Sequence, residues 1–317
     1  MRRLLFLAAL AAAPAPAETI YVSNERANTI SVIDAATLAV TATWPVGRRP
    51  RGILLSRDVK QLYVCASDEN AVQVIDRATG RVVADLPSGE DPETFALSPD
   101  GTLLFASNER DATVTAIDVP GRRVAFQVVV GVEPEGMAVS PDGRFAVSTS
   151  ETDNAVHWID IASRQVVGET PTDDRPRHAE FTADGRQLWV SAELGNSVAV
   201  IDTGTRKVID TIRFTVPGIA LEKVMPVQIR FTPDRRRAVI ALGRGNAVAI
   251  VDAASRKVEA VVPVGPRVWG VAISPDGRRA FSANGLSDSV SVIDLATAKT
   301  IGNIAVGRAP WGVVVAP

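Results

Sequence analysis

The heptapeptide NAVQVID at residues 70–76 ends in an aspartate that recurs along the chain at a nearly constant interval. A short run of alternating apolar residues precedes each copy, and the steps between successive aspartates are 42, 42, 42, 42, 50 and 42 residues. A period of about 40–45 residues is that of a four-stranded β-propeller blade. The chain therefore contains seven copies of one unit, whose aspartates are Asp34, Asp76, Asp118, Asp160, Asp202, Asp252 and Asp294.

Each unit divides into four short strands, as the copy at residues 52–86 shows. Its runs 52–56, 62–66, 71–76 and 81–86 are rich in β-branched residues and are bounded by turn residues, which favours strands over helices. In three units the first turn is Ser-Pro-Asp-Gly, where proline presets one dihedral angle and glycine accepts a positive φ. The recurring aspartate begins the third turn, where it can accept backbone N–H bonds. We therefore interpret the seven aspartates as structural.

The two ends of the chain complete one blade between them. Residues 312–317 align with the first strand at 270–275, and residues 18–22 align with the second strand at 60–64. One blade must then take three strands from the front of the chain and one from the back, which closes the ring and leaves no open sheet edge. The sequence predicts an all-β, seven-bladed propeller that occupies residues 18–317 as a single domain.

Residues 1–17 have the pattern of a secretory signal peptide. Arg2 and Arg3 precede an apolar run at 4–13 that is too short to span a membrane, and Ala15-Pro16-Ala17 gives the small-x-small cleavage pattern. We expect export to the periplasm, and no later stretch is long and apolar enough to cross a bilayer.

Composition and the remaining motifs exclude several functions. The 34 basic and 36 acidic residues give a net charge of −2, which argues against a nucleic-acid-binding protein. The single cysteine, Cys65, lies in an apolar strand and is expected to be a buried, inert thiol. The sequence contains no Gly-x-Ser-x-Gly, His-Glu-x-x-His or Cys-x-x-Cys motif. We expect a monomer without a catalytic motif of these kinds.

The repeat resembles a known family. Tyr21-Val22-Ser23-Asn24, followed by Asn28 and the run to Asp34, is similar to the YVTN family of β-propeller repeats, and later copies begin at Asn70, Asn154, Asn196 and Asn246. With its signal peptide and seven repeats the chain looks most like the PQQ-dependent catabolism-associated β-propeller proteins. That resemblance implies a non-catalytic periplasmic binding or scaffold protein, associated with quinoprotein-dependent alcohol oxidation and an ABC transport system. Its partner would be a quinoprotein dehydrogenase, a cytochrome, a transporter component or a small organic ligand, and no cofactor is expected.

The loops that lead into the innermost strands are the first candidate site. They gather at one end of the central channel, where functional residues concentrate. Most of these loops contain a proline at the same place, but the residue after it differs from unit to unit. A purely structural position would more often repeat one residue type. The candidate ligand or partner contacts on this rim are Arg51, Glu93, Glu135, Arg177, His178, Gln228, Trp269 and Trp311. Tryptophan faces stack on planar or apolar groups and arginine grips carboxylates. The alternative is that the rim charges pair with one another around a solvated opening.

The 50-residue step places eight additional residues on the same face. Residues 216–226 are apolar for a loop, and Ile219, Leu221 and Met225 could form a docking element. The alternative is that the loop folds over the channel mouth and packs on itself.

Two other functions compete with the binding or scaffold role. Relatives of YVTN propellers include sugar lactonases and the haem-bearing domain of a nitrite reductase. A lactonase-like hydrolase would act at the channel mouth with Glu93, Glu135, Arg177 and His178, where paired carboxylates could activate water. In that case Glu93, Glu135 and His178 could also hold a metal ion. A protein that only binds other proteins through its surface is the third possibility.

Overall fold

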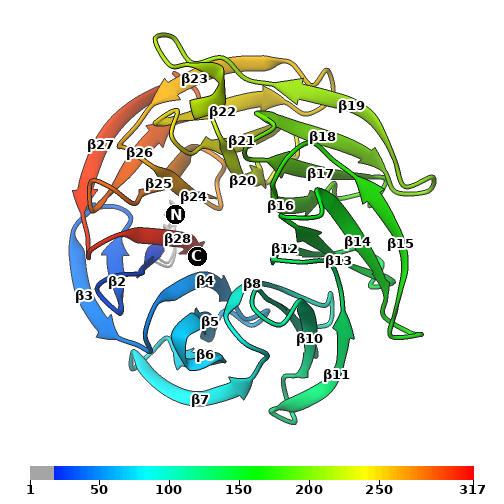
Figure 1. The fold of residues 1–317 in the computed structure, drawn as a ribbon. Coiled ribbons are helices and arrows are strands. Elements are labelled where there is room, and N and C mark those ends of the chain that lie inside the picture. The colour runs from blue at the N-terminus through cyan, green and yellow to red at the C-terminus, as the bar shows by residue number, and fades with distance from the viewer. Residues whose placement is uncertain (1–17) are drawn as a thin grey trace, which may run out of the picture.

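The seven sequence units fold into seven four-stranded antiparallel sheets arranged in a ring, which confirms the predicted fold (Figure 1). The computed structural model describes residues 18–317, so the predicted signal peptide at 1–17 lies outside the described residues. The innermost strands of the seven blades are β28 (Pro310–Ala316), β4 (Pro50–Leu55), β8 (Pro92–Leu97), β12 (Pro134–Val139), β16 (Pro176–Phe181), β20 (Pro226–Phe231) and β24 (Val268–Ile273).

The other three positions of each blade follow in chain order. The second strands are β1 (Thr19–Asn24), β5 (Gln61–Ala66), β9 (Leu103–Asn108), β13 (Phe145–Ser150), β17 (Gln187–Ala192), β21 (Arg237–Leu242) and β25 (Arg279–Asn284). The third strands are β2 (Thr29–Asp34), β6 (Ala71–Asp76), β10 (Thr113–Asp118), β14 (Ala155–Asp160), β18 (Ser197–Asp202), β22 (Ala247–Asp252) and β26 (Ser289–Asp294). The outer strands are β3 (Val40–Pro45), β7 (Arg81–Pro87), β11 (Arg123–Val129), β15 (Gln165–Pro171), β19 (Lys207–Arg213), β23 (Val258–Pro263) and β27 (Lys299–Ala305).

The ring is closed by strands from both ends of the chain, as the sequence predicts. β28 pairs with β1 in antiparallel register, with Val315 opposite Ile20 and Val313 opposite Val22. These side chains join the apolar layer between the first and last blades, where Phe281 and Val292 are fully buried. The last strand of the sequence is therefore the innermost strand of the first blade.

The second and third strands are buried almost throughout, because each blade packs its two faces against its neighbours. Trp158, Phe181 and Trp189, for example, fill the layers around the fifth blade, and the rings of Trp158 and Phe181 meet edge to face at 6.2 Å. The outer strands are mostly exposed. Burial between blades thus holds the innermost strands in fixed positions around the channel.

The seven recurring aspartates are structural, as predicted. One carboxylate oxygen of each accepts the backbone N–H of the residue three positions later, over 2.7–3.0 Å. At the other turn Gly101, Gly143 and Gly277 take φ values of +74°, +72° and +70°, which residues with a Cβ rarely adopt. Local turn chemistry therefore explains most of the repeat.

The repeated asparagine links two loops on the rim face. In four units this asparagine, and in the seventh unit Asp288 in its place, lies just before the third strand with φ between 49° and 56°. Its side-chain oxygen accepts a backbone N–H 21 residues later, over 2.8–3.0 Å. That N–H belongs to the loop that leads into the next blade. The linked pairs are Asn28–Arg49, Asn70–Asp91, Asn154–Arg175, Asn246–Arg267 and Asp288–Ala309.

Two units lack this link, each for a different reason. Ala112 keeps the left-handed backbone, with φ of 53°, but has no side-chain acceptor. In the fifth unit the residue 21 positions after Asn196 is Pro217, which has no N–H, and Asn196 Oδ1 is buried without a partner in the described part of the chain. The eight additional residues of this unit thus displace the donor.

Two short 3₁₀ helices complete the described chain, η1 (Ser67–Glu69) and η2 (Leu221–Lys223). Within residues 18–317 no helix has the length and apolar character needed to cross a membrane.

Candidate functional site

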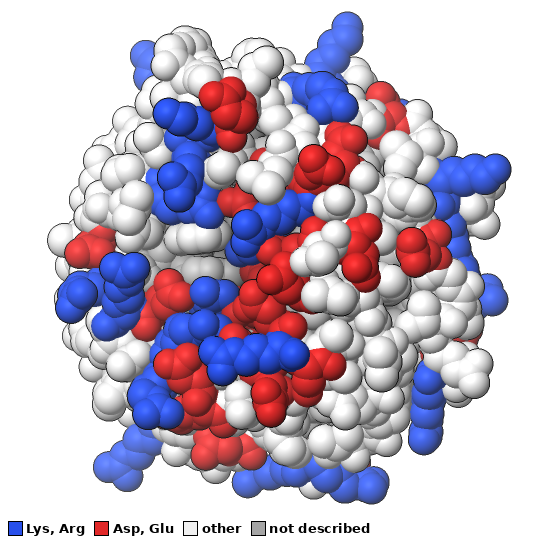
Figure 2. Space-filling view, viewed as in Figure 1, with Lys and Arg blue, Asp and Glu red and all other residues white. Residues whose placement is uncertain are grey.

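The rim residues predicted from the sequence come together at one end of the channel, but they form a packed layer and not a solvated opening. Glu93, Glu135, Arg177 and Trp311 are between 0% and 7% exposed. Arg177 reaches Glu135 over 2.9 Å, and Arg51 contacts Glu93. The rim charges therefore do pair with one another, as the alternative to a ligand contact stated. Acidic and basic side chains meet across the middle of this face in Figure 2.

A second tier of charges, which the sequence analysis missed, surrounds these pairs. Arg175 contacts Glu151 over 2.7 Å, and Arg267 contacts Glu193 over 2.8 Å. The carboxylates come from the loop after each second strand, and their repetition along the chain could have been noticed in the sequence. Glutamates follow the second strand at the same place in four units, Glu25, Glu109, Glu151 and Glu193.

Burial sets the electrostatics of this layer. It raises the pKa of Glu93 and raises that of Glu135 more strongly, although the adjoining arginines act in the opposite direction. Burial alone would lower the pKa of Arg177, but three carboxylates around it outweigh burial and raise that pKa. The arginines therefore stay charged, and the layer holds fixed positive groups between buried carboxyl groups.

The two tryptophans stack beside this network. The ring centroids of Trp269 and Trp311 are 6.4 Å apart with an interplanar angle of 20°. Arg267 lies 3.7 Å from the centroid of the Trp269 ring, and Arg177 lies 5.4 Å from it. Trp311 Nε1 is buried and has no hydrogen-bond partner among the described residues.

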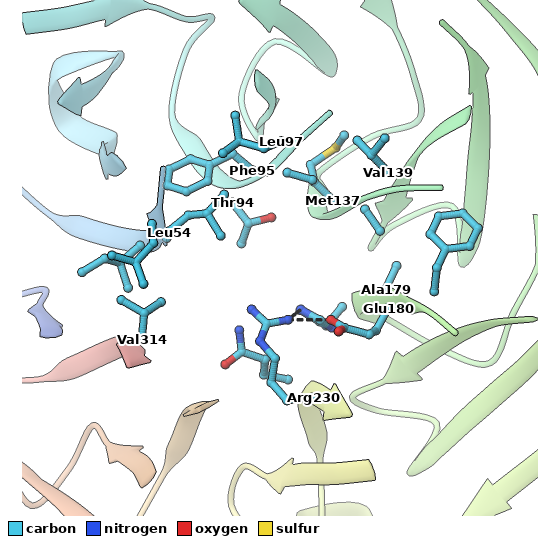
Figure 3. Close-up of a pocket in the computed structure, with 18 of the residues that line it drawn as sticks. Leu54, Thr94, Phe95, Leu97, Met137, Val139, Ala179, Glu180, Arg230 and Val314 are labelled. Carbon is cyan, nitrogen blue, oxygen red and sulfur yellow. Dashed lines mark hydrogen bonds and ion pairs between the residues drawn. The ribbon is translucent and has the colours of Figure 1, made fainter. Parts of the chain in front are cut away.

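Below the rim layer the channel widens into a pocket of about 590 Å³, shown in Figure 3. Its wall exposes apolar and polar atoms in similar measure, and the apolar side chains Leu54, Phe95, Met137 and Val314 surround much of the opening. The volume lies in the range of small-molecule sites, about 300–1,000 Å³. A concave pocket with a few convergent polar groups is the usual form of such a site.

Four polar side chains of the pocket, His178, Glu180, Gln228 and Arg230, come from the neighbouring strands β16 and β20. Arg230 Nη1 donates to Glu180 Oε2 over 2.7 Å and lies 3.0 Å from His178 Nε2. Because an arginine can only donate, His178 Nε2 is the acceptor of this contact. Burial, and then the charge of Arg230, hold the pKa of His178 well below its usual value, so the ring is neutral. Gln228 Oε1 accepts the N–H of Val271 over 2.7 Å.

The predicted rim set is therefore split between two levels. Arg51, Glu93, Glu135, Arg177 and Trp269 belong to the rim layer, whereas His178 and Gln228 line the pocket beneath it. Trp311 belongs to both, since it stacks on Trp269 and also lines the pocket. The sequence did not single out Glu180 and Arg230, because the face to which each residue of an inner strand points depends on a register that only the fold defines.

The metal set suggested by the sequence, Glu93, Glu135 and His178, does not assemble. His178 is held by Arg230, and the donors that come within 4.8 Å of one another in the described chain are Asp91, Glu93 and Glu109. Arg49 and Arg51 contact Glu93, and Arg110 lies 3.2 Å from Asp91. This acidic group is thus neutralised by arginines.

The candidate docking loop is partly folded against the sixth blade. Ile219 packs on the core cluster that contains Val224, which is fully buried, whereas Leu221 is 56% exposed. Met225 has a positive φ of 55° and its sulfur lies 3.6 Å from Arg267 Nη1. The loop therefore packs on the core layer between the fifth and sixth blades, and Leu221 is the most exposed of the three predicted docking side chains.

Comparison with protein families gives three matches. Residues 137–305 match the family described as "Lactonase, 7-bladed beta-propeller", which is 169 of 317 residues. Residues 9–96 match the YNCE-like β-propellers, and residues 57–177 match the cytochrome d1 haem domain. Comparison with curated proteins finds no match.

Solved structures share the fold at low sequence identity. A periplasmic gluconolactonase of Pseudomonas aeruginosa has a TM-score of 0.79 and 21% identity, over 95% of this chain and 99% of that one. Hydrazine synthase of Kuenenia stuttgartiensis has a TM-score of 0.78 and 23% identity, over 88% and 92% of the two chains. A dihydro-haem d1 dehydrogenase has a TM-score of 0.68 and 16% identity, over 93% and 74%.

These comparisons correct the function expected from the sequence. The expectation of a non-catalytic scaffold tied to quinoprotein-dependent oxidation is wrong, because the matching family models include those of the seven-bladed lactonases and of the cytochrome d1 haem domain. The repeat motif did not predict the function, because its residues form turns and loop links within the fold and do not define the chemistry of the channel.

Proposed function

The chain belongs to the family of seven-bladed β-propeller lactonases, and from that premise we propose that it hydrolyses a lactone inside its central channel. The observation that carries the proposal is the Glu180–Arg230 pair, whose charged groups lie 2.7 Å apart and are partly exposed at the wall of the channel pocket. It unites an acceptor for a proton with a fixed positive charge, which are the two groups that hydrolysis of an ester bond requires. The proposed ligand is therefore a small organic molecule.

The reaction would use this pair as follows. Arg230 would hold the lactone carbonyl oxygen and stabilise the negative charge that develops there. Glu180 would take a proton from a water molecule as the water oxygen bonds to the carbonyl carbon. The bond between that carbon and the ring oxygen would then break, and the proton would pass to the ring oxygen to leave a hydroxy acid.

His178 and Gln228 would be positioning residues. The acceptor at His178 Nε2 fixes one guanidinium nitrogen of Arg230 at 3.0 Å, so the charge stays at the pocket wall. Gln228 Oε1 is bonded to Val271, which orients the amide and leaves Nε2 as a further donor at the wall of the pocket. The rim layer would close the far end of the channel with its buried ion pairs.

The test is hydrolysis of unsubstituted and substituted lactones, followed as proton release at constant pH. Glu180→Gln and Arg230→Met should each lower kcat/KM by about 10²–10⁴-fold, the usual contribution of such groups. Glu259→Gln is the matched control, because Glu259 contacts Arg237 at the same distance of 2.7 Å on the outside of the ring. Hydrolysis that is equally fast in all three variants would contradict the proposal, as would the absence of any lactone hydrolysis.

We further propose that the protein is exported to the periplasm. The support is the sequence of residues 1–17, with its basic end, short apolar run and small-x-small pattern. Fractionation of cells that produce the full chain should recover a protein beginning at Glu18 in the periplasm. A cytoplasmic protein that retains Met1 would contradict this.

A further inference from the structure

The wall of the pocket indicates a class of lactone. We propose that the substrate carries an apolar substituent, such as an alkyl chain, and not the hydroxyl groups of a sugar lactone. This inference rests on the proposed lactone hydrolysis and adds the nature of the group attached to the ring. Its basis is the identity of the residues that the seven inner strands turn toward the channel.

Residues at the third and fifth positions of the inner strands form two rings, because alternate residues of a strand point to the same side. All but Gly136, Gly270 and Ala272 of these residues line the pocket. The ring at the fifth position of each strand is Leu54, Ala96, Ala138, Glu180, Arg230, Ala272 and Val314. Five of these residues are apolar, and the two that are not are paired with each other. Figure 3 shows that pair at one side of the opening, with Leu54 and Val314 on another part of the wall, at the left of the view.

The ring at the third position offers few groups for hydroxyls. It consists of Gly52, Thr94, Gly136, His178, Gln228, Gly270 and Gly312. The Thr94 hydroxyl already donates a hydrogen bond to the backbone oxygen of Glu135, and His178 is hydrogen-bonded to Arg230. Within these two rings, Gln228 Nε2 and the Glu180–Arg230 pair are the groups left for hydroxyls. A sugar lactone with more hydroxyl groups than these can bond would lose water without gaining partners, which disfavours its binding.

The geometry fits a ring at the polar side and a chain along the apolar side. The lactone carbonyl can reach the Glu180–Arg230 pair while a substituent lies against Leu54, Ala96 and Val314. Each buried methylene should then strengthen transition-state binding by about fourfold, from the free energy of burying one CH₂ group. The pocket of about 590 Å³ has room for several methylenes beside a six-membered ring.

The experiment compares kcat/KM for δ-valerolactone, δ-octalactone, δ-decalactone and glucono-δ-lactone, with spontaneous hydrolysis subtracted. We expect kcat/KM to rise along the alkyl series by at least tenfold from the first to the third lactone, and glucono-δ-lactone to be no better than δ-valerolactone. A flat alkyl series, or glucono-δ-lactone as the best substrate, would overturn the inference and leave lactone hydrolysis standing. No hydrolysis of any of the four would instead contradict the proposed function.

A variant that fills the apolar side gives a second measurement and removes no core side chain. Ala96→Trp should reduce the ratio of kcat/KM between δ-decalactone and δ-valerolactone to near one. Ala305→Trp, on the exposed outer strand β27, is the matched control and should keep the wild-type ratio. An unchanged ratio in Ala96→Trp would show that the chain does not lie in the channel.

Discussion

Restoring the missing loop link in the third unit should stabilise the protein. Ala112 has a φ of 53° and no acceptor, whereas in five other units the equivalent asparagine or aspartate accepts a backbone N–H over 2.8–3.0 Å. Ala112→Asn places an amide oxygen opposite the N–H of Glu133, 21 residues later. A left-handed backbone costs a residue such as alanine about 1–2 kcal/mol, which asparagine reduces, and one hydrogen bond contributes about 0.5–1.5 kcal/mol.

The expected gain in the free energy of unfolding is about 1–2 kcal/mol. A folded domain of this length has an unfolding entropy near 0.6 kcal/mol/K, so the Tm should rise by about 2–3 °C. Calorimetry or a urea titration measures this directly. Ala112→Gly is the control that relieves the left-handed backbone of its energetic cost without adding a hydrogen-bond acceptor. Asn154→Ala removes an existing hydrogen bond of 2.8 Å between two loops and should lower the Tm. If Ala112→Asn is no more stable than Ala112→Gly, the link contributes nothing and the reasoning fails.

Three further predictions concern buried groups. Arg177→Met leaves buried carboxylates unpaired and should cost about 3–5 kcal/mol, whereas Arg213→Met breaks an exposed pair and should cost under about 1 kcal/mol; equal urea midpoints would contradict the buried network. The pKa of His178 is lower in the folded protein than in the unfolded chain. The neutral ring therefore stabilises the fold above the unfolded pKa of about 6.5, and this stabilisation is lost as the pH falls. The free energy of unfolding should decrease by at most about 1.4 kcal/mol per pH unit from this group. His178→Gln should flatten the loss of stability between about pH 7 and pH 5, and an unchanged slope would refute this. Burial raises the pKa of Cys65 well above its usual value, so the thiol should react with a disulfide reagent only after unfolding, and rapid reaction of the native protein would disprove its burial.

The sequence determined the fold because the same local turn chemistry recurs seven times. Asp76 and its six equivalents each close a hairpin through bonds that depend only on near neighbours, so their spacing could be interpreted without a structure. The pairing of the two ends was also predictable, since Glu18 and Pro317 each mark an incomplete unit.

The candidate site was only partly predictable. The loops into the inner strands put Arg51, Glu93 and Arg177 on the correct rim, because their place follows from the repeat. Glu180 and Arg230 needed the strand register and the pairing of two side chains 50 residues apart, which no local pattern records. Once the register is known they stand out, because they interrupt a ring that is otherwise apolar.

The shared first blade affects how the whole molecule melts. An open stack of repeats frays from its ends, where the terminal unit has only one neighbour. Here neither terminus is such an end, because β28 and β1 are hydrogen-bonded in one sheet and each side of that sheet faces another blade. Detaching the last seven-residue strand would leave the first blade without its innermost strand and would expose both neighbouring apolar layers. Thermal denaturation should therefore proceed as one cooperative event in which all seven units are lost together.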